Sequence, residues 1–120
     1  MSGNRQKTGK DGEQKALSYI IKKKYQIVET NWRHQKCEID IIASKNKELV
    51  FIEVKTRTFP YFGDPQIAVT EKKQESIYTL ASEYMHRIEH EGEIRFDIIS
   101  ITMQPEQKIT HYTDAFFPTW

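Results

Sequence analysis

The sequence has little of what marks disulfide-stabilised, zinc-binding and membrane proteins. Its 120 residues include one cysteine, Cys37, which excludes an internal disulfide framework and a cysteine-rich zinc site. No segment approaches the roughly 20 apolar residues needed to cross a bilayer. The polar start of the chain has no apolar stretch typical of a signal peptide. We therefore expect a soluble, cytoplasmic protein without a membrane span.

An excess of one charge is also missing. The 18 lysine and arginine residues nearly balance the 17 aspartate and glutamate residues, and the formal net charge is +1. Such a chain has no overall field that attracts nucleic acid or an anionic membrane, so any binding of that kind must rest on local patches. The length fits one compact core. We expect residues 1–8 to be a flexible basic arm and residues 9–120 to form a single domain.

The spacing of apolar residues predicts both helices and strands. A three- and four-residue spacing predicts one helix over residues 11–24 and a second that starts near Thr70, a good N-cap, and is ended by Gly92. Alternating or continuous apolar runs predict strands at residues 25–32, 37–43, 49–57, 94–103 and 107–112. This order predicts an α/β fold in which helices flank a mixed sheet.

Two neighbouring strands carry acidic residues within apolar runs. The polar link at residues 45–48 is short enough for a hairpin, and pairing Ser44 with Leu49 sets Asp40 opposite Glu53. Directly opposed residues have Cβ atoms about 5 Å apart, a spacing at which bare carboxylates repel but a shared cation binds both. Oxygen ligands without a set of His or Cys favour Mg²⁺ or Mn²⁺ over zinc. The hairpin therefore predicts a divalent cation site.

A simpler interpretation of the hairpin stays open. The same register sets Glu38 opposite Lys55, which fits an ordinary cross-strand ion pair, and charged residues in strands usually face solvent. However, apolar Phe51 lies on the same face as the acids, which disfavours a purely solvated face. The period of two also places Glu53 and Lys55 on one face of the strand.

Charged residues outside the hairpin are predicted to approach it. Glu13 lies on the buried side of the first helix, where it either stabilises the helix dipole or supplies a third acid. Lys73 lies on the inward side of the first turn of the second helix, where it contacts a phosphate, pairs with a site acid or extends its ammonium to solvent. Arg33 is a candidate phosphate contact because it is close to the hairpin in sequence.

Three further features fall outside the acidic pair. The aromatic side chains of loop 58–65 either pack over the core edge or stack on splayed bases. The aromatic tail 116–120 either covers the core or forms a self-association surface. We expect Asp97 to be a structural partner of Arg95 or Arg57.

The acids and their spacing resemble a known nuclease pattern. Glu13 in the first helix, then Asp40, twelve intervening residues and the run Glu53-Val54-Lys55 resemble the PD-(D/E)XK nuclease core. That superfamily has an αβββαβ core, and the predicted element order matches it. Over about residues 9–117, the chain resembles the YraN family of predicted endonucleases, which are similar in fold to Holliday junction resolvases. The resemblance rests on residues 9–13, 38–43, 49–57, 73 and 95–97. In one departure, Cys37 stands where that family usually has glycine.

The resemblance implies an endonuclease that depends on Mg²⁺ or Mn²⁺ and acts on nucleic acid, with DNA, including branched or junction DNA, as the expected substrate. The implied catalytic residues are Asp40, Glu53, Lys55 and Glu13. Asp40 and Glu53 would hold the cation with help from Glu13 and the Val54 carbonyl, and Lys55 would orient or activate the nucleophile. Flanking phosphates would be held by Arg57, Lys73 and the basic amino-terminal arm. A nucleic-acid-binding module without catalysis stays an alternative, and a homodimer would suit an enzyme that cuts two strands.

Overall fold

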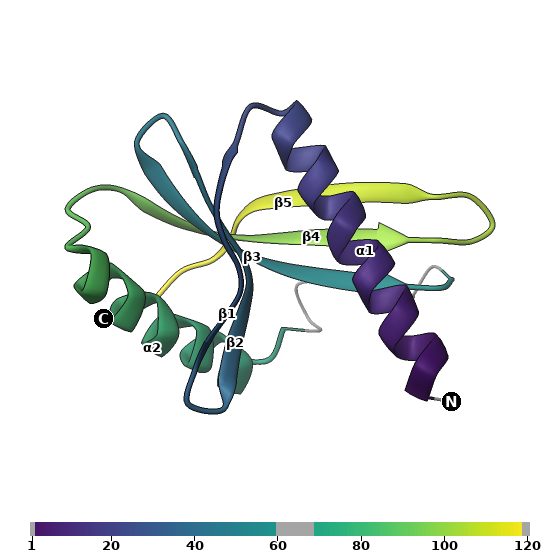
Figure 1. Cartoon of the computed structure of the whole chain (residues 1–120), viewed down its shortest axis with the longest axis horizontal. Coiled ribbons are helices and arrows are strands. Elements are labelled where there is room, and N and C mark those ends of the chain that lie inside the picture. Colours follow the sequence, from purple (N-terminus) through teal and green to yellow (C-terminus); the bar gives the residue numbers. More distant parts are fainter. Residues whose placement is uncertain (1, 60–68, 119–120) are drawn as a thin grey trace.

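A computed structural model describes residues 2–59 and 69–118. Within them, the chain forms α1 (Ser2–Lys22), β1 (Gln26–His34), β2 (Cys37–Lys45), β3 (Glu48–Arg57), α2 (Glu71–Ile88), β4 (Ile94–Thr102) and β5 (Lys108–Phe116). The strands build one sheet in the order β1-β2-β3-β4-β5, in which β3 and β4 are parallel and the other neighbours are antiparallel (Figure 1). This mixed sheet flanked by two helices confirms the predicted α/β fold and is consistent with a restriction-endonuclease-like core.

Helix α1 is longer than the sequence predicted. It begins at Ser2 instead of Asp11, so residues 2–8, expected as an arm, continue the helix. Those residues are all polar, and a segment without apolar side chains has no hydrophobic periodicity from which a helix is recognised. At the other end, Lys24 adopts a left-handed φ of 72°, and the N–H of Tyr25 donates to the carbonyl of Ile20. The division into an arm and a domain at residues 9–120 stays a prediction.

Helix α2 begins where predicted and ends earlier. The Oγ1 of Thr70 accepts a hydrogen bond from the Lys73 N–H at 3.2 Å, which confirms the N-cap. The helix ends at Ile88, because Glu89 takes up a left-handed conformation with φ 54°. The prediction that Gly92 ends the helix is therefore wrong: a non-glycine residue supplies the left-handed turn three positions earlier.

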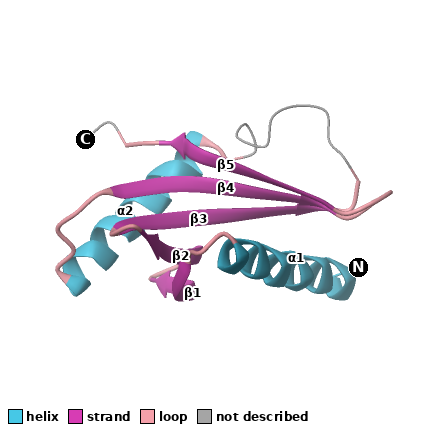
Figure 2. Ribbon diagram, turned by 90° about the horizontal axis from the view of Figure 1, so that it is seen from above, coloured by secondary structure: helices cyan, strands magenta, loops and turns pink. Residues whose placement is uncertain are grey.

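The two helices cover opposite faces of the sheet (Figure 2). Consecutive residues of β3 enter different cores, because side chains alternate along a strand: Phe51 packs with α2, and Ile52 packs with α1. The core on the α2 face also contains Leu80, Phe96 and Ile98, and the core on the α1 face contains Ala16, Ile20 and Ile99. Each helix therefore has its own apolar layer to pack on.

Helix α1 approaches β3 closely at Gly12. A Cβ atom at this position would lie 2.8 Å from the Cβ of Thr56 and would overlap its hydroxyl group. At Gly9, one turn earlier, a Cβ would meet nothing within 4 Å. The close approach at Gly12 fixes the next residue, Glu13, beside the carboxyl end of β3.

The aromatic tail begins inside the core. Phe116 is buried and stacks on Phe96 with ring centroids 5.6 Å apart, whereas the side chain of Phe117 is 71% exposed. The interpretation that the tail covers the core is thus confirmed for Phe116. Trp120 and the loop aromatics Tyr61 and Phe62 lie outside the described residues.

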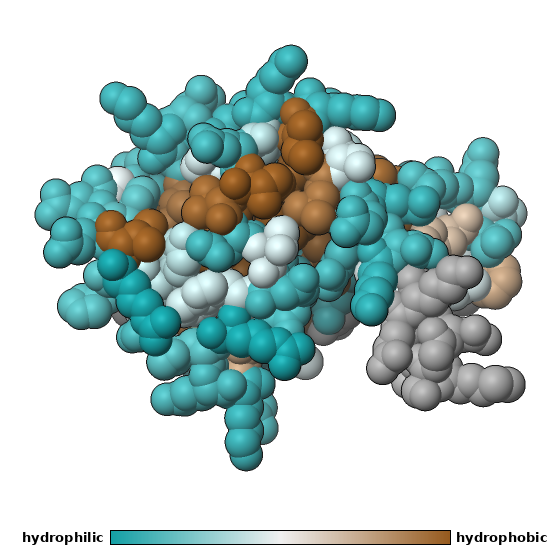
Figure 3. Space-filling model, in the orientation of Figure 1, coloured by the Kyte–Doolittle hydropathy of each residue, from teal (hydrophilic) through white to brown (hydrophobic). Residues whose placement is uncertain are grey.

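Apolar side chains also remain on the surface. On the face shown in Figure 3 they gather near the centre, and polar side chains surround them. Exposed large apolar residues include Ile21 at the end of α1 and Val28 in the edge strand β1. Neither described helix combines the length and the apolar character needed to cross a bilayer.

Candidate cation and nucleic-acid site

Strand β2 leaves the regular ladder with β3 at Asp40. The predicted register holds as far as the pair of Ile41 with Ile52. Beyond it, the N–H of Val54 donates to the side-chain Oδ2 of Asp40 at 2.8 Å. Ile39 packs on the α2 face although Ile41 packs on the α1 face, so the alternation of side chains breaks at Asp40. The Asp40 carboxyl group is thereby turned onto the backbone of β3.

Strand β1 has a matching irregularity at Asn31. This residue has a φ of 49°, a left-handed conformation that asparagine tolerates better than most residues. Its side-chain Nδ2 donates to Glu38 Oε1 at 2.7 Å and lies 3.3 Å from Glu13 Oε2. The amide of Asn31 therefore connects an acid of β2 with the acid of α1.

Three carboxyl groups converge at this irregularity. Glu13, Glu38 and Asp40 each offer one oxygen, and these oxygens lie within 4.8 Å of one another. The structure thus places Glu13 beside the acids of the hairpin, which fits one of the two roles that the sequence left open for it. Glu38 was expected opposite Lys55; instead it pairs across β1 and β2 with Arg33, whose Nε lies 2.7 Å from Glu38 Oε2. Glu38 is a candidate cation ligand that was not predicted, although its place two residues before Asp40 in a strand was the available signal.

Asp40 also lies against a fourth acid, Glu53. Burial, a hydrogen bond with Glu53 and the charge of Glu53 together raise the pKa of Asp40 to about 9, although the Val54 N–H opposes the shift. The Glu53 side chain is 6% exposed, and its Oε2 has no hydrogen-bond partner in the described part of the chain. Asp40 therefore belongs to the open group of three acids and also contacts the buried acid Glu53.

Lys73 reaches this buried acid from α2. Its Nζ lies 3.5 Å from Glu53 Oε2, an ion-pair distance that is longer than a good hydrogen bond. Of the roles that the sequence left open for Lys73, pairing with a site acid is therefore the one the structure shows. The Lys73 side chain is 42% exposed, so solvent screens much of the attraction.

Lys55 and Arg57 follow Glu53 along β3. The ladder with β4 continues regularly from Glu53 opposite Ile98 to Arg57 opposite Thr102, so alternation keeps both basic residues on the face of Glu53. No carboxylate lies within ion-pair distance of Lys55 among residues 9–59 and 69–118. The N–H of Val54 donates a hydrogen bond to Asp40, and the role of the Val54 carbonyl as a cation ligand stays a prediction.

Asp97 belongs to a separate, buried network. The guanidinium of Arg95 donates to both of its oxygens at 2.8 Å, and His111 Nε2 lies 2.6 Å from Oδ2. Burial pushes the pKa of Asp97 upward, but the hydrogen bonds from His111 and Arg95 outweigh it and hold that pKa below its ordinary value. The predicted structural pairing with Arg95 is confirmed.

An open groove leads to the acids. It has a volume of about 740 Å³. It lies between residues 9–14 of α1 on one side and strands β1 and β2 on the other. Glu13 and Glu38 line it, together with Asn31 and Arg33. A solvent-borne cation or an extended polar ligand thus has direct access to the carboxyl groups.

The fold and these side chains define an α/β protein with a candidate divalent-cation site at an irregular hairpin. The chain belongs to the group described as Uncharacterised protein family UPF0102, whose model matches residues 12–101. This is the YraN-like group, so the predicted resemblance to the YraN family is confirmed.

Relatives match most of the chain. A UPF0102 protein of Christiangramia forsetii is 44% identical over 110 residues, which cover 91% of this chain and 92% of the relative. One from Thermodesulfovibrio yellowstonii is 41% identical over 109 residues, covering 91% and 95%. Among solved structures, Pyrococcus furiosus SfsA in complex with Ca²⁺ matches with a TM-score of 0.34 and 16% identity over 84% of this chain and 62% of that chain. A similarity at that level supports no inference about ligands.

Proposed function

We propose that this protein is a metal-dependent endonuclease that hydrolyses phosphodiester bonds of nucleic acid, with DNA, including branched or junction DNA, as its substrate. The observation that carries the proposal is the contact between Asp40 and Glu53, in which one buried carboxylate oxygen lacks a hydrogen bond. A buried carboxylate packed against a second acid is costly, and a shared divalent cation offsets that cost.

The donor set fits Mg²⁺ or Mn²⁺. Mg²⁺ and Mn²⁺ prefer oxygen ligands, and carboxylates are their usual protein ligands. The oxygens of Glu13, Glu38 and Asp40 lie within 4.8 Å of one another, so these residues would be able to hold such an ion together. We propose Asp40 and Glu53 as the principal ligands and Glu13 as a further one, and we add Glu38 to the set inferred from the sequence. The Val54 carbonyl stays a predicted ligand.

When bound, the cation polarises a phosphodiester and lowers the pKa of water near it. Lys55 then orients the attacking water and offsets negative charge that develops on the phosphate, because its ammonium is on the face of Glu53 and has no carboxylate partner in the described residues. Arg33 and Arg57 hold phosphates on either side of the bond that is cut. Lys73 shifts from Glu53 to a phosphate when a cation occupies the acids.

A second function is favoured by the pairing of Lys73 with Glu53. This ion pair compensates one buried carboxylate without a metal ion, so the same fold suits recognition of nucleic acid without hydrolysis. A homodimer and a cytoplasmic location also stay predictions from the sequence.

The test is cleavage of a labelled panel containing single-stranded, duplex, flapped and four-way-junction DNA and RNA, in Mg²⁺, Mn²⁺ or EDTA. We expect metal-dependent cleavage of at least one DNA substrate, reduced at least about 100-fold in Asp40→Asn and Lys55→Met. Lys47→Met, in the distant β2–β3 turn, is the matched control and should retain activity. Binding without any cleavage would favour the recognition module, and cleavage that persists in both site variants would reject the assignment.

A further inference from the structure

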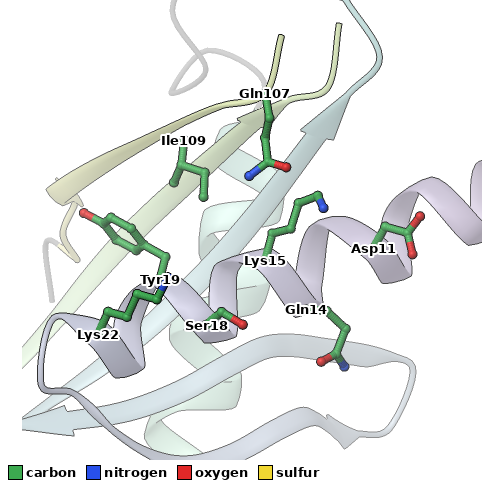
Figure 4. A pocket seen from close by; sticks show the side chains of 8 residues that line it. All are labelled: Asp11, Gln14, Lys15, Ser18, Tyr19, Lys22, Gln107 and Ile109. Atoms are coloured by element: carbon green, nitrogen blue, oxygen red, sulfur yellow. The ribbon is translucent and has the colours of Figure 1, made fainter.

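A second polar groove lies on the other side of α1. Its volume is about 350 Å³, and it is bounded by α1 and the start of β5 (Figure 4). Lys15, Ser18, Tyr19 and Lys22 line it from α1, and Gln107 and Ile109 line it from the opposite wall. The four helix residues follow the spacing i, i+3, i+4 and i+7, so they form one continuous stripe along the helix.

Within the part of the chain that the structure describes, the two lysines of this groove have no acidic partner. Among the side chains described at 9–59 and 69–118, no carboxylate lies within ion-pair distance of Lys15 or Lys22. Asp11 is four residues before Lys15, the usual spacing of a helical ion pair, yet the two do not pair, and Figure 4 shows Lys15 extending toward Gln107 instead. Lys15 is half-buried. Among the described lining residues, two lysines thus face one acid, Asp11, and this excess of positive charge suits an anionic ligand.

The groove adjoins the groove that leads to the acids. Asp11 and Gln14 line both this groove and the one that contains Glu13 and Glu38. A helix rises 1.5 Å per residue, so Lys15 and Lys22 are about 10 Å apart along α1. The two ammonium groups end flexible side chains, so at this separation they can contact two different phosphates of one strand.

We propose that the α1–β5 groove binds the phosphodiester backbone of the nucleic-acid strand that leads away from the acidic site, with Lys15 and Lys22 each contacting a phosphate. The choice of ligand rests on the proposed function. Ser18 and Gln107 supply neutral hydrogen-bond donors, and among the described lining residues Asp11 is the acid that opposes the phosphates. Because these groups contact the backbone and not the base edges, binding through the groove is independent of sequence and weakens as salt rises.

The test is the salt dependence of binding to 20-nucleotide single-stranded DNA, duplex DNA and single-stranded RNA, followed by fluorescence anisotropy with Ca²⁺ and in EDTA. We expect the double variant Lys15→Gln/Lys22→Gln to bind about tenfold more weakly at moderate salt, and the slope of log K against log salt to fall by about 1.4–1.8 in magnitude. The Lys15→Arg/Lys22→Arg variant should keep the wild-type slope. Lys47→Gln is the matched control for the loss of one positive charge.

Each outcome separates the groove from the catalytic proposal. An equal loss for DNA and RNA identifies the shared backbone as the ligand, and a loss for one polymer alone names that polymer. Unchanged affinity and slope in the double variant, an equal loss in Lys47→Gln, or no binding by the wild type would overturn the inference. Cleavage by the wild type with unchanged binding in the double variant would reject the groove and leave the nuclease proposal standing. Lys22→Gln alone, at an exposed position, should lose about half of the slope change and guards against misfolding.

Discussion

Lys73 of α2 and Glu53 of β3 form an ion pair, with Lys73 Nζ 3.5 Å from Glu53 Oε2. The same oxygen lacks a hydrogen bond within the described part of the chain. A divalent cation bound to Asp40 and Glu53 would compete with the Lys73 ammonium for this oxygen. The ion pair therefore opposes cation binding.

Removing the Lys73 charge should strengthen cation binding. We expect Lys73→Met to bind Mn²⁺ about fivefold more tightly, a gain of about 1 kcal/mol, because the pair is partly screened by solvent. Calorimetric titration with Mn²⁺ measures the difference. Lys72→Met, an exposed neighbour in the same helical turn, should change the affinity little. Weaker Mn²⁺ binding by Lys73→Met would mean that the lysine does not compete with the cation.

The raised pKa of Asp40 should make stability depend on pH. Between the ordinary pKa of aspartate and about 9, the folded protein keeps a proton that the unfolded chain has lost. The free energy of unfolding of the wild type therefore falls as the pH rises through this window, by at most about 1.4 kcal/mol per pH unit. Asp40→Asn removes this pH-dependent contribution to the free energy of unfolding.

Denaturant titrations from pH 5 to 8 in EDTA test the pH effect. The stability of Asp40→Asn relative to the wild type should increase steadily with pH. Parallel pH profiles for the two proteins would show that Asp40 holds no extra proton in the folded state.

Gly12→Ala should destabilise the protein, although alanine has a higher helix propensity than glycine. Alanine is favoured over glycine inside a helix by about 1 kcal/mol, and Gly9→Ala should be stabilised by up to that amount because its surroundings are open. Gly12→Ala should instead lose about 1–3 kcal/mol through overlap with Thr56. Thermal unfolding of both variants measures the difference, and Thr56→Ala should recover part of the loss. A stabilised Gly12→Ala would show that α1 is not held this close to β3.

The Asp97 network should contribute more to stability than the acidic site does. Asp97→Asn leaves the largely buried guanidinium of Arg95 with Glu48 as its acidic partner among the described residues, and we expect a loss of about 3 kcal/mol or more in the free energy of unfolding. Asp114→Asn is the matched control, because Asp114 is exposed and asparagine tolerates its left-handed φ of 51°. Its stability should change by less than about 0.5 kcal/mol. Equal effects of the two substitutions would contradict the structural role.

The sequence predicted those features that depend on local periodicity. The two-residue turn of the hairpin fixed its register, so the pairs up to Ile41 with Ile52 follow from the pattern. The N-cap at Thr70 fixed the phase of α2, and that phase pointed Lys73 inward toward Glu53. These predictions needed only the period of an element and one boundary residue.

Other features depend on contacts between distant elements. The left-handed conformation of Asn31 and the break in side-chain alternation at Asp40 turn Glu38 toward Glu13. A break of this kind cannot be predicted from a periodic sequence pattern. The contact of His111 with Asp97 depends on how β5 pairs with β4, where the register shifts between Phe96 and Ile98. Both features are determined by packing between elements and not by the secondary-structure propensity of the local sequence.

The central claim is that Asp40 and Glu53 hold a divalent cation, and thermal unfolding during a Mn²⁺ titration tests it most directly. A cation that binds only the folded state raises its stability, and at about 100 times the dissociation constant the gain is about 2.7 kcal/mol, or about 10 °C in Tm for a chain of this length. The account predicts this shift for the wild type and little or none for Asp40→Asn and Glu53→Gln. An unchanged Tm in the wild type, or the same shift in both variants, would contradict it.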